Sequence, residues 1–174
     1  MSSLIQYITF PGVIFHELGH VIFCKLAKVK IYRISYFKFG ATLGFVEHEA
    51  PQKLHQSFFI SIGPLILNSF ICLIFTAIFF RTLFVSVSHV DLLILVFWWI
   101  GFSAGVHAFP SVDDIENFKN SVYERSRWSL FRIISLPFVY IFSLVKKFEY
   151  IEARLIYAST LGIVLPFFFY FFQK

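Results

Sequence analysis

The chain has 174 residues, of which 58% are apolar, 21% are aromatic and only 14% are charged. Soluble domains have about 45–50% apolar and about 25% charged residues, so this composition excludes an ordinary soluble enzyme and a disordered chain. The net charge of +5 does not indicate nucleic-acid binding, because the aromatic residues lie inside apolar runs rather than between basic side chains. We therefore expect a single polytopic, all-α domain over residues 1–174 that is embedded in a lipid bilayer.

Five apolar segments are candidate membrane spans, each of roughly the length that a bilayer requires. They cover about 4–27, 58–80, 90–109, 129–145 and 155–172. The fourth segment is short and carries Arg132 near its start, a charge that can reach the membrane interface when the side chain extends. The sequence thus predicts about five transmembrane helices.

The stretch between the first two segments predicts a short β-hairpin. Residues 31–39 are rich in Tyr, Ile and Phe, Gly40 follows, and residues 41–48 form a second extended run. A different pattern follows the third span, where Ile115, Phe118 and Val122 fall on one face of a predicted helix that starts near Ser111. This pattern is typical of a helix that lies in the membrane interface.

Basic residues predict the orientation of the chain. The loop that contains the hairpin carries five of them: Lys28, Lys30, Arg33, Lys38 and Lys53. The loop after the second span carries Arg81 alone, so the positive-inside rule places the hairpin in the cytoplasm. Lys146, Lys147 and Arg154 fall on the opposite side in a five-span arrangement and do not agree with this rule. We expect a bacterial cytoplasmic membrane, with the functional site towards the cytoplasm.

The first apolar segment contains the motif His-Glu-Leu-Gly-His at residues 16–20. On a helix, His16 and His20 project from one face and can bind a single zinc ion, while Glu17 is placed to deprotonate a water molecule that zinc activates. Three ionisable residues within an apolar helix are energetically costly and normally face an internal site. The sequence therefore predicts a zinc site with His16 and His20 as ligands and Glu17 as the catalytic base.

Together with a later Gly-Pro and an Asn, this motif resembles the site-2 protease family of intramembrane zinc metalloproteases. The second element reads Ser61-Ile-Gly-Pro-Leu-Ile-Leu-Asn68 in this chain. The resemblance covers roughly residues 10–118 and implies a catalytic core at about 4–118, with additional C-terminal spans within 129–172. It is that of a minimal or divergent member, since the chain has no room for an inserted PDZ domain.

The resemblance also implies that an aspartate is the third zinc ligand, and it favours Asp114. Asp113 and His107 are alternatives, because Asp113 is adjacent and His107 lies deeper in the preceding apolar segment. On local pattern alone, Ser111 and Asp114 instead form a helix capping box. A cluster at residues 47–49 is a further rival.

In the second element, the resemblance implies that Gly63, Pro64 and Asn68 contact the substrate. The alternative interpretation is structural: a kink with close helix packing at Gly63 and Pro64, and an interhelical hydrogen bond from Asn68. Both interpretations are compatible with one another.

The expected function is zinc-dependent hydrolysis of peptide bonds in or next to transmembrane segments, with a membrane protein or peptide as substrate. A catalytically inactive zinc protein that binds partners and a metal transporter are the alternatives, and a zinc hydrolase of lipids or small amides uses the same motif. A transporter predicts metal ligands in several spans, whereas this sequence concentrates them in the first.

Overall fold

The computed structural model describes residues 3–40, 42–85, 91–124, 130–147 and 151–172, and these residues are mostly helical. A single two-stranded antiparallel sheet occurs within these ranges. The elements in chain order are α1 (Ser3–Ile8), α2 (Phe10–Leu26), β1 (Ile31–Ser35), β2 (Phe45–His48), α3 (Leu54–Val85), α4 (Leu92–Val106), α5 (Val112–Glu124), α6 (Leu130–Lys147), α7 (Ile151–Ser159), the π-helical turn η1 (Thr160–Val164) and α8 (Leu165–Phe171).

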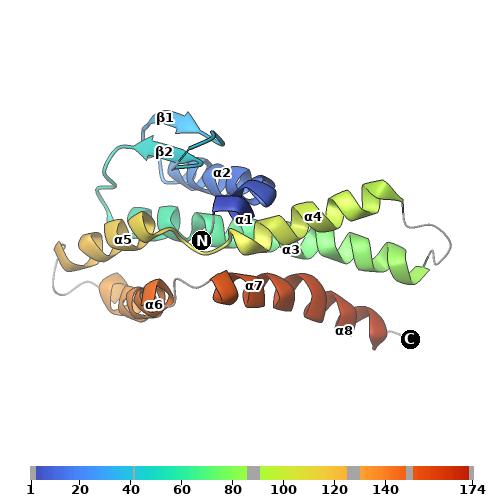
Figure 1. Ribbon diagram of the computed structural model, residues 1–174. Helices are drawn as coiled ribbons and strands as arrows, with labels where there is room; N and C mark the ends of the chain where they lie inside the picture. The colour runs from blue at the N-terminus through green and yellow to red at the C-terminus, as the bar shows by residue number, and fades with distance from the viewer. Residues whose placement is uncertain (1–2, 41, 86–90, 125–129, 148–150, 173–174) are drawn as a thin grey trace.

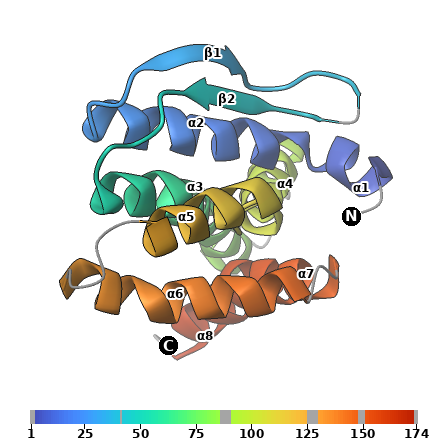
Figure 2. The same ribbon diagram turned by 90° about the vertical axis from the view of Figure 1, so that its left-hand side faces the viewer.

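The molecule is elongated and its two ends are built differently (Figure 1). At one end, the second half of α3, α4 and the continuous run α7–η1–α8 lie alongside one another as a bundle. At the other end, α2 and α6 run across the direction of the bundle, as Figure 2 shows, and the hairpin covers α2. α2 and α6 therefore do not share the axis of the bundle.

Small residues allow the bundle helices to approach closely. A side chain at Gly105 of α4 would come within 2.9 Å of the Cys72 sulfur in α3 and within 3.0 Å of Ala158 in α7. Side chains at Gly101 of α4 and at Gly162 of η1 would likewise come too close to α3, within 3.0 and 3.1 Å of Thr76 Cγ2. Small residues at helix contacts are typical of bundles in membranes, where close backbone approach replaces the hydrophobic driving force.

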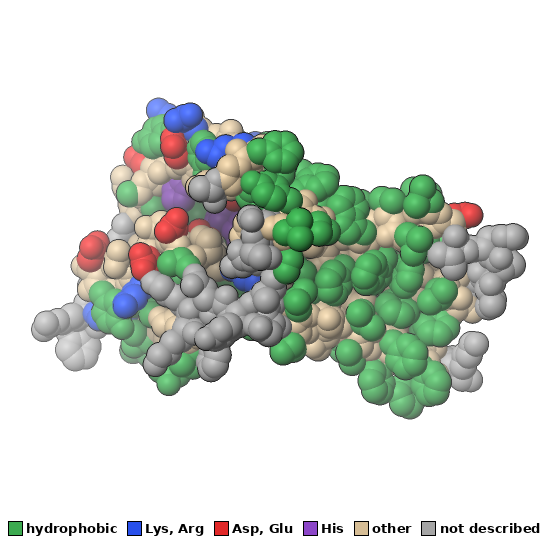
Figure 3. All heavy atoms as spheres, in the orientation of Figure 1, with side chains coloured by type: hydrophobic (Ala, Val, Ile, Leu, Met, Phe, Trp, Pro, Cys, Tyr) green, Lys and Arg blue, Asp and Glu red, His purple; other side chains and the backbone are tan. Residues whose placement is uncertain are grey.

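The face of the bundle that Figure 3 shows is mainly apolar among the described residues. Exposed side chains on it include Phe70, Ile78, Leu95, Ile163 and Phe169. Soluble proteins rarely expose an apolar surface of this extent. Two helices, Leu54–Phe84 and Ala153–Phe171, are long and apolar enough to cross a membrane, and Leu92–Val106 and Arg132–Leu144 are shorter apolar helices.

The first and fourth predicted spans differ from expectation. The first is divided between α1 and α2 at Thr9, and α2 lies between the hairpin and α3 rather than along the bundle. The fourth segment forms α6, which lies crosswise to α7–α8 (Figures 1 and 2). The apolar composition of α2 therefore reflects burial within the protein, because strands cover one of its sides and α3 the other.

The hairpin and the helix after Ser111 are confirmed. β1 and β2 pair in antiparallel register, from Ser35 opposite Phe45 to Ile31 opposite His48, with an irregularity near Arg33. The predicted face of α5 is buried against α3 and α6, in a cluster made of Phe58, Ile62, Ile115, Phe118, Val122, Val139 and Phe142. This cluster fixes α5 against α3 and α6, and the first turn of α5 places Asp114 opposite the histidines of α2.

Candidate metal centre

The two histidines of the motif point from one face of α2 with their rings in contact, 5.0 Å between centroids. His20 Nδ1 lies 3.1 Å from the Ile60 carbonyl oxygen, and His16 Nδ1 lies 2.9 Å from the His107 carbonyl oxygen. Because a carbonyl oxygen only accepts, each Nδ1 must carry the proton and donate it. When these rings are neutral, each Nε2 consequently carries the lone pair that metal ligation requires. When they are protonated, each Nε2–H faces Asp114 instead.

Each of these two carbonyls lacks its usual helical partner. In α3, the Ile60 carbonyl would accept from the N–H of residue 64, but residue 64 is proline and has no N–H. The His107 carbonyl belongs to the residue that ends α4, where helical carbonyls have no intrahelical donor. The local backbone therefore provides two strong acceptors at the positions that orient the histidine rings.

Asp114 faces both free Nε2 atoms from the first turn of α5. Its Oδ1 lies 3.3 Å from His20 Nε2, and its Oδ2 lies 3.6 Å from His16 Nε2. The same carboxylate accepts from the Ser111 backbone N–H at 2.8 Å and from the Ser111 hydroxyl at 2.6 Å. Asp114 thus forms the predicted capping box and at the same time faces the histidines, so its capping role is compatible with the predicted ligation.

Electrostatics keep Asp114 ionised. Burial raises the pKa of its carboxyl, but the charge on protonated His20 and the hydrogen bonds from His16 and His20 outweigh burial and hold the pKa well below its ordinary value. The carboxylate is therefore the form present at neutral pH, which is also the form that binds a metal.

The donor set fits zinc. One ligand atom from each of His16, His20 and Asp114 lies within 4.8 Å of the others. Two nitrogen or oxygen ligands of a tetrahedral zinc stand about 3.3–3.5 Å apart, given bonds of about 2.0–2.2 Å. The distances of 3.3 and 3.6 Å from the two Asp114 oxygens to the histidines are close to this spacing. Three protein ligands also leave the fourth position open, which is the arrangement of catalytic rather than structural zinc sites.

The alternative third ligands lie elsewhere. The His107 ring bonds the Thr9 hydroxyl, with 2.7 Å between Nε2 and Oγ1, and contributes to the centre through its backbone carbonyl. Asp113 lines a neighbouring cavity but does not join the group of ligand atoms. In the hairpin, Glu47 faces Arg33 at 3.8 Å and His48 bonds the Glu49 carbonyl.

Glu17 is buried, with 8% of its surface exposed, directly below the hairpin. A side chain at Gly44 would come within 2.6 Å of Glu17 Cγ, so this position tolerates only glycine while Glu17 keeps its place. Two cavities of about 250 Å³ flank Glu17, one towards His107 and one along β2, and both reach His16. The carboxyl group therefore sits where a molecule in either cavity would meet the metal ligands.

Gly63, Pro64 and Asn68 lie in the packing between helices. A side chain at Gly19 of α2 would come within 2.8 Å of Pro64 Cα, which shows how closely α2 approaches α3. Asn68 is fully buried and its Nδ2 donates to the carbonyls of Gly12 and His107, at 3.1 and 2.9 Å. The close helix packing at Gly63 and Pro64 and the interhelical hydrogen bond from Asn68 are therefore confirmed. The contact with substrate that the resemblance implies stays a prediction.

The sequence did not indicate the residues whose backbone orients a ligand, nor the glycine whose lack of a side chain leaves room for Glu17. Ser61 donates to the Asp114 carbonyl at 3.3 Å, and the Ile60 carbonyl orients His20, so one turn of α3 supports two ligands. Gly44 shapes the cover over Glu17. Pro64, four residues after Ile60, was a signal in the sequence for the role of the Ile60 carbonyl. Proline lacks the N–H that would otherwise bond this carbonyl.

Comparison with protein-family models, with curated proteins and with solved structures finds no match for this chain.

The zinc content of single-residue variants tests which residue is the third ligand. We expect about one zinc per chain in the detergent-purified protein, a loss in His16→Ala and Asp114→Asn, and retention in the adjacent control Asp113→Asn and in His107→Ala. Atomic absorption on dialysed protein measures this. Loss of zinc in Asp113→Asn with retention in Asp114→Asn would contradict the assignment.

Replacement of Pro64 tests the orienting carbonyl. In Pro64→Ala, the new N–H of residue 64 competes with His20 for the Ile60 carbonyl, so zinc affinity falls by about 10–100-fold, as is usual for loss of such supporting contacts. Competition against a fluorescent zinc chelator measures the affinity. Pro137→Ala is the matched control, because Pro137 also lies inside a helix but far along the chain from the ligands. Equal affinities in both variants would show that the freed carbonyl has no role.

Proposed function

We propose that this protein is a zinc-dependent peptidase that cleaves membrane proteins or peptides close to the membrane surface. The observation that carries the proposal is the buried Glu17 carboxyl beside two oriented histidines and Asp114, between two open cavities. When bound by His16, His20 and Asp114, zinc supplies Lewis acidity, which polarises a carbonyl group and makes a water molecule more acidic.

Glu17 is the general base in this proposal. It accepts a proton from the attacking water and delivers it to the amine that leaves, which is the usual role of the glutamate in this motif. Burial under the hairpin keeps bulk water away from the carboxyl, and the flanking cavities give the substrate access.

The hairpin supports an extended substrate. β2 pairs with β1 on one edge, and its residues Phe45, Val46 and His48 line the cavity that contains His16, Glu17 and His20. Within the residues that the structure describes, no third strand pairs with β2. A peptide that adds to this edge would present its backbone to the metal ligands, since strand addition fixes a chain in the extended form that hydrolysis requires.

The bundle is the membrane anchor in this proposal, with three crossings rather than five. Residues 65–85 of α3 and the run α7–η1–α8 each provide about 30 Å of helix at 1.5 Å per residue, the thickness of the hydrocarbon core. α4 is shorter and packs against both of them. The metal centre then lies at the end of the bundle where charged side chains gather (Figure 3).

Three crossings also account for the basic residues. Lys146 and Lys147 of α6 and Arg154 of α7 then lie on the same side of the membrane as the hairpin. Arg81 lies towards the opposite end of the bundle. This distribution agrees with the positive-inside rule and favours a cytoplasmic metal centre, with α6 along the membrane surface.

A transport pathway is less well supported than hydrolysis. Among the described residues, the one group of three or more potential ligands lies at the end of the bundle, and none lies along it.

The Glu17→Gln variant tests the peptidase. We expect it to bind one zinc like wild type and to cleave peptides about 10²–10⁴-fold more slowly, because it loses the proton acceptor but keeps the ligands. Mass spectrometry of a mixed-sequence peptide library incubated with detergent-purified protein measures cleavage. Wild-type rates in Glu17→Gln, or no cleavage by zinc-loaded wild type, would contradict the proposal.

Cysteine labelling tests the membrane placement. A membrane-impermeant maleimide should label Tyr32→Cys of β1 in inverted membrane vesicles, whereas Ile163→Cys of the bundle should react only in a small, membrane-permeant form. Both native cysteines, Cys24 and Cys72, are buried and give a low background. Labelling of Ile163→Cys by the impermeant reagent would show that the bundle does not lie in lipid.

A further inference from the structure

The cavity along β2 adjoins a third cavity at the candidate metal centre. His48, Asp114 and Asn117 line the cavity along β2, and the same three residues line the third cavity, which has a volume of about 400 Å³. The third cavity lies between residues 50–51, which follow β2, and the helices α3 and α5. The two cavities together therefore form a groove that passes the metal ligands and continues beyond them.

The lining of the third cavity is rich in groups that form hydrogen bonds. Besides the three shared residues, α3 and α5 contribute hydroxyl, amide and carboxylate side chains: Ser57, Ser61, Asn120, Ser121 and Glu124. An apolar side chain in this space would separate these groups from water without offering them a partner, which is costly. The cavity therefore favours a polar occupant.

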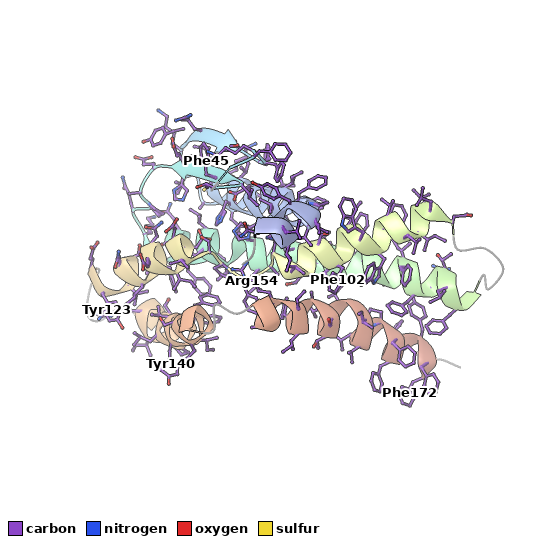
Figure 4. The ribbon with its side chains drawn as sticks, viewed as in Figure 1. Phe45, Phe102, Tyr123, Tyr140, Arg154 and Phe172 are labelled. Carbon is purple, nitrogen blue, oxygen red and sulfur yellow. The ribbon has the colours of Figure 1, made fainter. Side chains whose placement is uncertain are left out.

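The contribution of α5 follows one side of the helix. Asn117, Asn120 and Glu124 follow Asp114 at intervals of three or four positions, the spacing of neighbours on a helix surface. In Figure 4, α5 runs from the metal centre towards the labelled Tyr123 near its far end. Asp114 and Asn120 are about 9 Å apart along the helix axis at 1.5 Å per residue, a length that about three residues of extended peptide cover.

The side-chain amides of Asn117 and Asn120 are available to a ligand. Both residues are exposed, and neither amide group forms a hydrogen bond within the described part of the chain. An asparagine amide both donates and accepts, so it can pair with the C=O and the N–H of a peptide backbone. The nearby hydroxyl groups already have partners, because Ser57 donates to Ser121 at 2.9 Å and Ser61 donates to the Asp114 carbonyl at 3.3 Å.

We propose that the third cavity binds the polar segment that flanks the membrane-spanning part of the substrate, and that Asn117 and Asn120 hold the backbone of this segment. The preferred substrates carry uncharged, hydrogen-bonding side chains for about three residues on one side of the scissile bond. This inference rests on the proposed peptidase function, because it extends the same site. Asn120 is a specificity residue in this role and takes no part in metal binding or proton transfer.

Hydroxamates test the inference without requiring cleavage, since a hydroxamate binds zinc directly. One series of peptides ends in a hydroxamate and carries its residues on the N-terminal side of the zinc. The other begins with a succinyl hydroxamate and carries its residues on the C-terminal side. Each series contains a short probe with one serine, a polar probe with three further residues of serine and asparagine, and an apolar probe with three further valines.

Binding to zinc-loaded, detergent-purified protein is measured by calorimetry in wild type, Asn120→Leu and Lys119→Leu. Lys119 is the matched control, because it is the exposed neighbour of Asn120 on α5 and lines neither cavity. Asn120 is exposed and leucine favours a helix more than asparagine does, so Asn120→Leu retains the fold.

In one of the two series, we expect the polar probe to bind wild type and Lys119→Leu at least about tenfold more tightly than the short probe. In Asn120→Leu most of this gain disappears, while the short probe binds as in wild type. Equal affinity of the polar and short probes for wild type in both series would overturn the inference, and so would an undiminished gain in Asn120→Leu. An apolar probe that binds wild type as tightly as the polar probe would contradict the preference for a polar segment.

Two further results have a different meaning. Weaker binding of the short probe in Asn120→Leu would also overturn the inference, because Asn120 would then support the metal centre itself. If no hydroxamate binds zinc-loaded wild type, the metal centre is not accessible and the peptidase proposal itself is wrong.

Discussion

Two backbone carbonyls without helical partners determine the geometry of the metal centre. One belongs to Ile60 and is free because Pro64 lacks an N–H, and the other belongs to His107 at the end of α4. Each accepts from a histidine Nδ1 and leaves the corresponding Nε2 for a metal. Because these carbonyls come from α3 and α4, the orientation of the rings depends on the close approach of α2 to both helices. Gly19 opposite Pro64 and Gly12 opposite the Ser103 carbonyl make that approach sterically possible.

The packing of α2 against α3 and α4 also separates the two ends of the molecule. One end carries the candidate metal centre, and the other is the apolar bundle. α2 crosses the bundle and is covered by the hairpin, whereas the second half of α3, α4 and α7–η1–α8 expose apolar side chains along their length (Figures 2 and 3). Apolar composition alone does not distinguish a helix that is buried in protein from one that is buried in lipid. For this reason the sequence predicts five similar spans, although the structure contains two helices long enough to cross a membrane.

The centre of the site could be predicted from the sequence because its residues are local. His16, Glu17 and His20 lie within five positions of one helix, and Ser111 with Asp114 forms a local capping pair. The partnership of Asp114 with α2 is a long-range contact, and the sequence alone left Asp113 and His107 as alternatives. The contact of Gly44 with Glu17 could not be predicted, because it depends on where the hairpin folds over α2. The position of Arg154 beside the cavity towards His107 likewise depends on where α7 packs. Asn68 was identified as a polar residue in an apolar helix, and its hydrogen bonds agree with the structural interpretation.

The shared carboxylate of Asp114 has a thermodynamic consequence. Its Oδ2 is held by Ser111 at the start of α5, so the group that would bind a metal also begins a helix. A ligand that binds only the folded arrangement stabilises it by an amount that grows with the logarithm of ligand concentration. Metal occupancy would therefore be linked to the folding of α5 and, through Phe118 and Val122, to the docking of α6. Zinc availability would thus set the stability of a surface helix whose residues never contact the ion.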